Sequence, residues 1–144
     1  LGNESGGGNN FQYAYNGIKQ LDKTRPVHYE GNSDYADVSS TMYASYEAIN
    51  SIGSSRQGKT GQKPHIQCEN SHSMGNSMGN VRDMFDLYER YTCLTGEFIW
   101  DFKDQGLLTQ ATSGEDYWAY GGDFGDVPND GNFCINGLGR DAFF

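Results

Sequence analysis

Three stretches of the chain repeat apolar residues at the three- and four-residue spacing of an amphipathic helix. The first follows two possible N-caps, Asn9 and Asn10. The second is weaker, and the third is the clearest because charged residues occupy its opposite face. The apolar positions are Phe11, Ala14, Tyr15, Ile18 and Leu21 in the first stretch, Tyr46, Ile49 and Ile52 in the second, and Met78, Val81, Phe85, Tyr88 and Tyr91 in the third. The pattern therefore predicts three helices.

Short apolar runs between and after these helices predict β-strands. They cover residues 27–29, 38–43, 64–69 and 98–101. The resulting order is helix, strand, strand, helix, strand, helix, strand, and this alternation is typical of parallel strands joined by crossover helices in an α/β fold. From Gly106 onward the periodicity is lost and glycines are frequent, so we expect a long irregular C-terminal loop region.

Polar or aromatic side chains stand at the end of each predicted strand. Glu30, Tyr43, Glu69 and Trp100 occupy these positions. In a β/α barrel the carboxyl ends of the strands converge on one rim, where catalytic groups are mounted. A lone glutamate at such a place is more often a helix cap or a salt-bridge partner. A catalytic role for Glu69 therefore depends on evidence from other parts of the sequence.

Length and charge restrict the class of protein. The 144 residues are enough for one domain with a core of its own. The chain begins at Leu1 and contains no apolar stretch near the length of a membrane span, so we interpret it as a piece of a longer polypeptide with no membrane partner. The formal net charge of -9, without clustered Lys and Arg, argues against a nucleic-acid partner.

Cysteine and aromatic content add two expectations. Cys68, Cys93 and Cys134 are an odd number at wide spacings, which indicates neither a zinc site nor a disulfide framework. We expect buried free thiols, which favour the cytoplasm over secretion. The aromatic content of 14% and the 20 glycines suit a site that presents aromatic faces to a sugar, although a loop-rich domain explains the same composition.

Two glutamates, Glu4 and Glu69, each stand before small residues and glycine. Cleavage of a glycosidic bond with retention uses two carboxyl groups about 5 to 5.5 Å apart, one as nucleophile and the other as acid and then base. One must stay ionised while the other stays protonated, so their surroundings must differ. Tyr43 and His72 are possible hydrogen-bond donors to Glu69, whereas Glu4 lies in a loop of small residues.

Several segments resemble the β-galactosidases of glycoside hydrolase family 2. Leu1-Gly-Asn-Glu-Ser-Gly is similar to the acid/base signature of that family, and residues 68–77 are similar to its nucleophile signature. The resemblance continues, in order, through residues 42–44, 98–105, 120–126 and 129–138. It implies that residues 1–144 are a partial catalytic domain, the C-terminal half of a (β/α)8 TIM barrel with about four strands and the truncated end of another at Leu1.

The resemblance also implies catalytic roles at matching positions. Glu4 would be the acid/base and Glu69 the nucleophile of a double displacement on terminal β-D-galactosides. Tyr43 would donate to the nucleophile and ease departure of the glycosyl group. Glu30 is a third carboxylate at a strand end, and we interpret it as a supporting group.

Substrate-binding roles follow in the same way. Asn3 would bind the sugar 2-hydroxyl, His72 the galactose hydroxyls, and Trp100 would form a platform for the apolar face of the sugar. A loop histidine and a core tryptophan are the structural alternatives for the last two.

Two metal ions are implied by the resemblance. Asn136 and the backbone carbonyl of Phe133 resemble ligands of a sodium ion beside the galactose 6-hydroxyl, and oxygen ligands suit such a hard cation. Magnesium would be held by Glu4 with two further ligands from earlier in the parent chain.

Some positions depart from the family pattern. Gly6, Gly7 and Gly8 stand where bacterial relatives have a histidine nearby, and Asn70 and Ser71 replace bulkier or apolar neighbours of the nucleophile. These departures affect the preference for the acceptor sugar, and the resemblance therefore specifies galactose less firmly than it specifies glycosidase chemistry. The alternatives are a β-glucuronidase or β-mannosidase of the same family, and a carbohydrate-binding fragment without turnover.

The partial barrel has consequences for assembly. A barrel closes only with all its strands, so an isolated half leaves unpaired edges and an exposed inner face. We expect the isolated chain to be inactive, and to associate with itself or require the missing half. The resemblance implies that the parent is a homo-oligomer.

Overall fold

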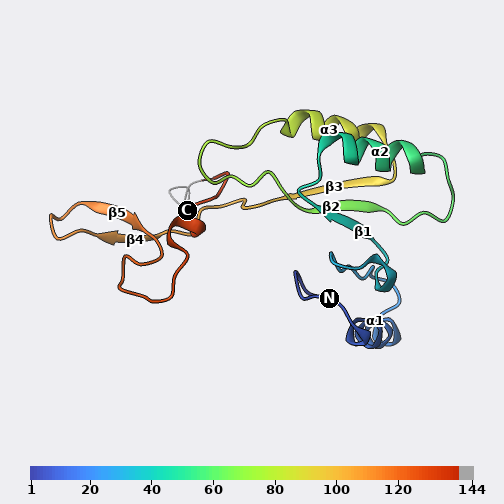
Figure 1. Ribbon diagram of the computed structural model, residues 1–144, viewed down its shortest axis with the longest axis horizontal. Coiled ribbons are helices and arrows are strands. Elements are labelled where there is room, and N and C mark those ends of the chain that lie inside the picture. The colour runs from blue at the N-terminus through green and yellow to red at the C-terminus, as the bar shows by residue number, and fades with distance from the viewer. Residues whose placement is uncertain (140–144) are drawn as a thin grey trace. The chain divides into compact units, whose positions relative to one another are not determined.

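The computed structural model describes residues 1–139, which form two compact units. The first contains Leu1–Asn70 and Asn80–Phe98, and the second contains Ser71–Gly79 and the chain from Ile99 onward. In chain order the elements are α1 (Asn9–Leu21), the 3-10 helix η1 (Ser33–Tyr35), β1 (Ser39–Met42), α2 (Tyr46–Arg56), β2 (His65–Asn70), α3 (Val81–Arg90), β3 (Leu94–Ile99), β4 (Leu107–Gln110), β5 (Asp116–Ala119) and the 3-10 helix η2 (Gly131–Cys134) (Figure 1).

The strands β1, β2 and β3 form one sheet in that order, and β1 is parallel to β2. Contacts between β2 and β3 progress in the same direction along both strands. Thr95 Oγ1 donates to the carbonyl oxygen of His65 at 3.0 Å, and Gln67 Nε2 lies 3.4 Å from Glu97 Oε2. Since α2 connects β1 to β2 and α3 connects β2 to β3, the predicted alternation of parallel strands and helices is present.

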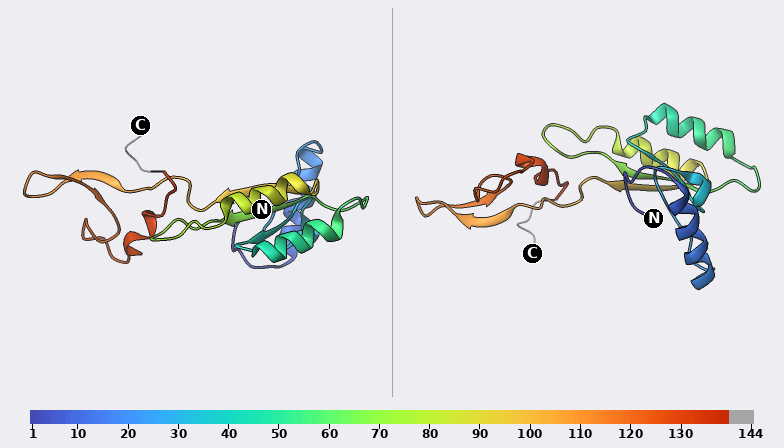
Figure 2. Two further views of the ribbon diagram at one scale, coloured as in Figure 1. Left: turned by 90° about the horizontal axis from the view of Figure 1, so that it is seen from above. Right: turned by 60° about the horizontal axis from the view of Figure 1, so that its bottom comes forward.

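Helices α2 and α3 lie side by side on one face of the sheet (Figures 1 and 2). Their shared core consists of Ile49, Met84, Leu87 and Leu94, all nearly excluded from solvent. The sequence pattern predicted that Phe85 would belong to the buried face of α3, and this was wrong, because Phe85 is 47% exposed. The helix starts only at Val81, and its inward stripe runs through Met84 and Leu87 instead.

The first helix is present, but neither predicted N-cap is used. Helix α1 starts at Asn9, and the cap position is Gly8, whose φ of 132° lies in the region that favours glycine. The apolar stripe is only partly packed. The ring of Phe11 stacks on that of Tyr29 with centroids 4.1 Å apart, whereas Leu21 is 92% exposed, so α1 buries no residue completely.

Two predicted strands differ from the observed ones. Residues 27–29 make only a single parallel bridge, between His28 and Val38, because polar residues follow at once. The last parallel strand is Leu94–Ile99 rather than residues 98–101, since Gly96 continues the strand instead of ending it. Trp100 therefore lies just beyond the carboxyl end of β3.

The expected long irregular C-terminal region contains a β-hairpin. Strands β4 and β5 pair antiparallel, with Leu107 opposite Ala119, and a turn closed by two backbone hydrogen bonds between Ala111 and residues 114–115 connects them. The sequence pattern did not predict this hairpin, because frequent glycines indicate irregular structure. Gly114 instead adopts a φ of 89° in the turn that connects the two strands.

Cys68, Cys93 and Cys134 are free thiols, and they are half-buried rather than buried as the sequence predicted. Cys68 keeps its thiol close to the backbone, with Sγ 3.3 Å from the carbonyl oxygen of Thr41. Among the described residues, no helix has both the length and the apolar character needed to cross a membrane.

Candidate active site

Glu69 lies at the carboxyl end of β2 and is half-buried. Both of its carboxylate oxygens accept a hydrogen bond from another part of the first unit. Asn3 Nδ2 donates to Oε1 at 3.0 Å, and the hydroxyl of Tyr43 donates to Oε2 at 3.1 Å. The orientation of the carboxylate is thereby fixed by the loop before α1 on one side and by the end of β1 on the other.

A register shift in the sheet explains why Glu69 points toward these partners. Thr41 is opposite Gln67, but Met42 is opposite Glu69, so the pairing skips Cys68. Strict alternation would put Glu69 on the same face as Gln67, which is covered by α3. The irregularity moves the glutamate off that face, as β-bulges beside functional sites commonly do.

Tyr43 directly follows β1, and its backbone N–H donates to the carbonyl oxygen of Glu69 at 2.9 Å. Its φ is 50°, a left-handed conformation that costs a non-glycine residue on the order of 1–3 kcal/mol. Burial raises the pKa of the Tyr43 phenol well above its usual range, and the hydrogen bond to Glu69 raises it further. The phenol therefore remains a proton donor to Glu69 at neutral pH.

Glu4 occupies the exposed loop before α1, also with a left-handed φ, of 48°. Its backbone N–H donates to Glu30 Oε1 at 3.1 Å, and the hydroxyl of Ser5 donates to the carbonyl oxygen of Asn3 at 2.8 Å. Glu30, which the sequence predicted to be a supporting group, thus holds the backbone that carries Glu4.

The second unit brings together the other predicted residues. Trp100, Phe133 and Asn136 line one hollow of about 340 Å³. The ring of His72 packs against that of Phe133 with centroids 5.6 Å apart and an interplanar angle of 59°. The hollow also presents polar side chains, including Asp126. An aromatic wall with polar groups around it is the kind of surface that a sugar requires.

Asn136 is the most unusual residue of this hollow. It is 1% exposed, and within the described part of the chain neither Oδ1 nor Nδ2 has a hydrogen-bond partner. A buried amide without partners is costly, and such groups are commonly satisfied by a ligand, ion or water. The oxygen of Asn136 therefore suits a hard cation or a hydroxyl group.

No cluster of three or more His, Cys, Asp or Glu side chains suited to a metal ion occurs among residues 1–139. Magnesium at Glu4, with two further ligands from earlier in the parent chain, stays a prediction. A sodium ion is different because its usual ligands are uncharged oxygens, and Asn136 supplies one.

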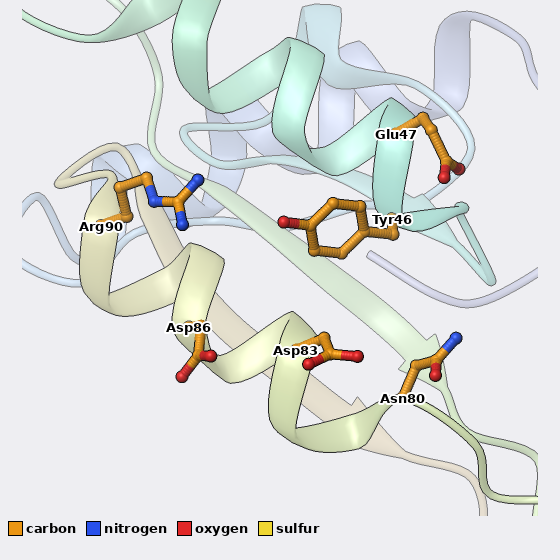
Figure 3. Close-up of a pocket in the computed structure, with 6 residues that line it drawn as sticks. All are labelled: Tyr46, Glu47, Asn80, Asp83, Asp86 and Arg90. Atoms are coloured by element: carbon orange, nitrogen blue, oxygen red, sulfur yellow. The ribbon is translucent and has the colours of Figure 1, made fainter.

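Another hollow, of about 350 Å³, lies between α2 and α3 (Figure 3). Its lining residues are Tyr46, Glu47, Asn80, Asp83, Asp86 and Arg90. None of the residues predicted to act on substrate belongs to it. We therefore place the candidate active site at the carboxyl ends of the strands.

Sequence reasoning missed a polar cluster behind Glu69. Glu97 Oε2 accepts hydrogen bonds from Asn70, Gln67 and Tyr88. Tyr88 belongs to the apolar face predicted for its helix, and Glu97 lies just before the strand predicted at residues 98–101, so the sequence pattern does not connect the two.

The fold and these strand-end residues define a class of protein. The family model described as "Glycosyl hydrolases family 2, TIM barrel domain" matches residues 1–141, and the chain belongs to this family.

The names of individual relatives are more specific than the family description. The chain is 50% identical over 143 residues to a protein named beta-galactosidase from Priestia megaterium. It is 44% identical over 153 residues to a beta-galactosidase from Leuconostoc mesenteroides, and 46% identical over 149 residues to one from Oenococcus oeni. Each match covers 96% of this chain but only 13% or 14% of the relative's length.

Proposed function

We propose that the full-length protein is a retaining β-galactosidase and that residues 1–144 carry both of its catalytic carboxyl groups. The observation that carries the proposal is the hydrogen bonding of Glu69 by Asn3 and Tyr43 at 3.0 and 3.1 Å. Because Glu4 directly follows Asn3, these bonds attach the loop with one glutamate to the strand end with the other. The beta-galactosidase names of the relatives support the choice of galactoside.

The reaction proceeds in two displacements. In the first, Glu69 attacks the anomeric carbon while Glu4 gives its proton to the leaving glycosidic oxygen, so that an ester bond to Glu69 forms. In the second, the ionised Glu4 takes a proton from water, and the water oxygen attacks the same carbon and releases the carboxylate of Glu69. Two inversions at one carbon retain its configuration.

Tyr43 and Asn3 assist at the nucleophile. When the ester breaks, negative charge returns to Glu69, and a hydrogen bond already aimed at that carboxylate stabilises the transition state. Tyr43 is such a donor, at 3.1 Å. Asn3 donates to the other oxygen at 3.0 Å, and its amide binds the sugar 2-hydroxyl once substrate is present.

The second unit supplies sugar-binding groups. Trp100 offers an aromatic face to the apolar side of the sugar, and His72 hydrogen-bonds its hydroxyls. The buried, unpartnered amide of Asn136 would hold a sodium ion together with the carbonyl oxygen of Phe133. Such an ion, when bound, orients a sugar hydroxyl by direct coordination. Magnesium would share Glu4 with residues outside this chain.

The proposal extends to the architecture of the parent. Residues 1–144 form the C-terminal half of a (β/α)8 barrel, and the parent is a homo-oligomer. The isolated chain is inactive, because a half barrel leaves strand edges unpaired. Gel filtration combined with an activity assay of the 144-residue chain tests this, and a monomeric active chain would contradict it.

The deciding experiment uses the full-length protein with Glu69→Gln. We expect the wild type to hydrolyse a nitrophenyl β-galactoside faster than the matching glucuronide or mannoside, and the variant to lose this activity with its folding intact. A faster reaction with the glucuronide or mannoside would reassign the substrate within the family. Unchanged activity in Glu69→Gln would exclude Glu69 as the nucleophile. Binding of galactose without any turnover in the wild type would favour a carbohydrate-binding protein.

A further inference from the structure

A cluster of polar side chains lies in the first unit, between the sheet and α3. Glu97, on β3, is at its centre. Its Oε2 accepts hydrogen bonds from the hydroxyl of Tyr88 at 2.8 Å and from Asn70 Nδ2 at 2.5 Å, and Gln67 Nε2 lies 3.4 Å away. Its Oε1 is buried without a hydrogen-bond partner among the described residues. One carboxylate thus gathers donors from β2 and α3.

The cluster is directly connected to both halves of the contact between Tyr43 and Glu69. Gln67 is completely buried, and its Oε1 accepts a hydrogen bond at 2.8 Å from the backbone N–H of Ala44, the residue after Tyr43. Asn70, which donates to Glu97, is the residue after Glu69. Gln67 Nε2 also donates to the hydroxyl of Tyr88 at 3.0 Å. The end of β1 is therefore anchored to Glu97 through Gln67, both directly and by way of Tyr88, and the end of β2 through Asn70.

These anchors hold unusual backbone geometry. Tyr43 has a left-handed φ of 50°, and the pairing of β1 with β2 shifts register between Thr41 and Met42. Conformations of this kind persist only where surrounding contacts determine them. Gln67 and Asn70 flank the register shift on β2, and Glu97 is the acceptor they share.

We propose that Glu97 is a positioning residue for the hydrolytic reaction, which holds the end of β1 through Gln67 and the end of β2 through Asn70 so that the hydroxyl of Tyr43 meets the carboxylate of Glu69. The inference rests on the proposed function, because it gives Glu97 a role only if Glu69 reacts. Glu97 does not touch the substrate.

The donors of the cluster are suited to this role. Burial raises the pKa of the Tyr88 phenol well above its usual range; Gln67 partly opposes this shift, and the contact with Glu97 adds to it. Tyr88 therefore donates at every pH at which such an enzyme works. Asn70 and Gln67 carry amide donors that do not titrate. The three donors therefore do not change their protonation state at neutral pH.

The test measures kcat and KM of the full-length protein for a nitrophenyl β-galactoside. We expect Glu97→Ala to lower kcat on the order of 100-fold, as small displacements of reacting groups do, with KM changed much less. Glu97→Gln keeps an acceptor oxygen of the same shape and should retain kcat within about fivefold. Glu89→Gln serves as the control. It removes an exposed carboxylate from α3, one residue after Tyr88, and we expect unchanged kinetics.

A double-mutant cycle with Tyr43→Phe separates positioning from a general structural role. If Glu97 acts through the contact between Tyr43 and Glu69, then Glu97→Ala costs far less kcat in the Tyr43→Phe background than in the wild type. Equal losses in both backgrounds would overturn the proposal. If Glu97→Ala does not fold, Glu97→Asp replaces it, since this variant keeps the charge but shortens the reach of the carboxylate.

The two proposals fail in different ways. If the Glu69→Gln variant remains active, the proposed mechanism is wrong, and the positioning role of Glu97, which depends on it, is wrong as well. Loss of activity in Glu69→Gln together with full kcat in Glu97→Ala and Glu97→Asp would overturn only the positioning role.

Discussion

The hydroxyl of Tyr43 donates a hydrogen bond to Glu69 Oε2 at 3.1 Å, although the two residues are 26 positions apart in the sequence. The contact exists because β1 and β2 are neighbouring parallel strands and both residues stand at their carboxyl ends. It joins a donor that stays protonated to the carboxylate that we propose as nucleophile.

This contact predicts the effect of removing one hydroxyl group. In the full-length protein, Tyr43→Phe should lower kcat on the order of 10² to 10³-fold, because Glu69 departs from the glycosyl ester without its donor. Rapid-mixing kinetics with a nitrophenyl β-galactoside should then show a burst as the ester accumulates. Tyr13→Phe, on the exposed side of α1, is the matched control and should change nothing. A variant with wild-type kcat and no burst would contradict the role of Tyr43.

Glu30 should act through the acid/base. Its carboxylate accepts the backbone N–H of Glu4 at 3.1 Å, so Glu30→Ala removes one anchor of a loop held in a left-handed conformation. We expect roughly a tenfold loss of kcat/KM with lactose, whose leaving group needs protonation, and a smaller loss with a nitrophenyl galactoside. Equal losses with both substrates would argue against an effect through Glu4.

We expect the activity of the full-length protein to depend on a sodium ion bound by Asn136. The amide of this residue is buried without a partner in the described structure, and Asn136→Ala removes the oxygen that would bind the cation. We expect activity to depend on sodium concentration at constant ionic strength, and the variant to require at least about tenfold more sodium. The same sodium titration curve for wild type and variant would show that Asn136 is not a ligand.

His65 should make stability fall in mild acid. Burial, with a smaller contribution from Arg56, lowers its pKa from 6.5 to about 4. Between these values the unfolded chain binds a proton that the folded chain does not, so stability is full above pH 6.5 and falls as the pH drops toward 4. Urea inactivation of the full-length protein, measured against pH, should be flatter in this window for His65→Gln. A slope that does not change would exclude His65 as its source.

The helix layer should depend on Leu87 rather than Phe85. Leu87 is completely buried in the core with Ile49, so Leu87→Ala should destabilise the unit by about 2–5 kcal/mol. Phe85 is 47% exposed, and Phe85→Ala should cost much less. The midpoints of urea inactivation compare the two variants, and a larger shift for Phe85→Ala would contradict the observed packing of α3.

Much of the first unit could be predicted from the sequence because it depends on local pattern. The apolar repeat located α1, α2 and α3 within a few residues, and alternation with short apolar runs predicted the parallel strands. The orientation of α3 could not be derived, because Phe85 and Leu87 are both apolar and only the position of the sheet distinguishes them. The hairpin of β4 and β5 was missed because its glycines were interpreted as breaks.

The candidate site was predictable at the level of strand ends and not at the level of contacts. The ends of the predicted strands suggested Tyr43 and Glu69, since parallel strands finish at one edge. The register shift that turns Glu69 toward Tyr43 depends on how two strands pair, which neither strand encodes alone. The contacts of Glu97 could not be predicted for the same reason, because its partners come from a neighbouring strand and a helix.

The most direct test of the account asks which side chain becomes bonded to the sugar. The full-length protein is incubated with an activated 2-deoxy-2-fluoro-β-galactoside, whose fluorine slows breakdown of the glycosyl ester, and is then digested and mapped by mass spectrometry. The account predicts one fluorosugar per active site, attached to Glu69 in the peptide that contains residues 65–76. A label on Glu4, on another residue, or none on an enzyme that still hydrolyses galactosides, would contradict it.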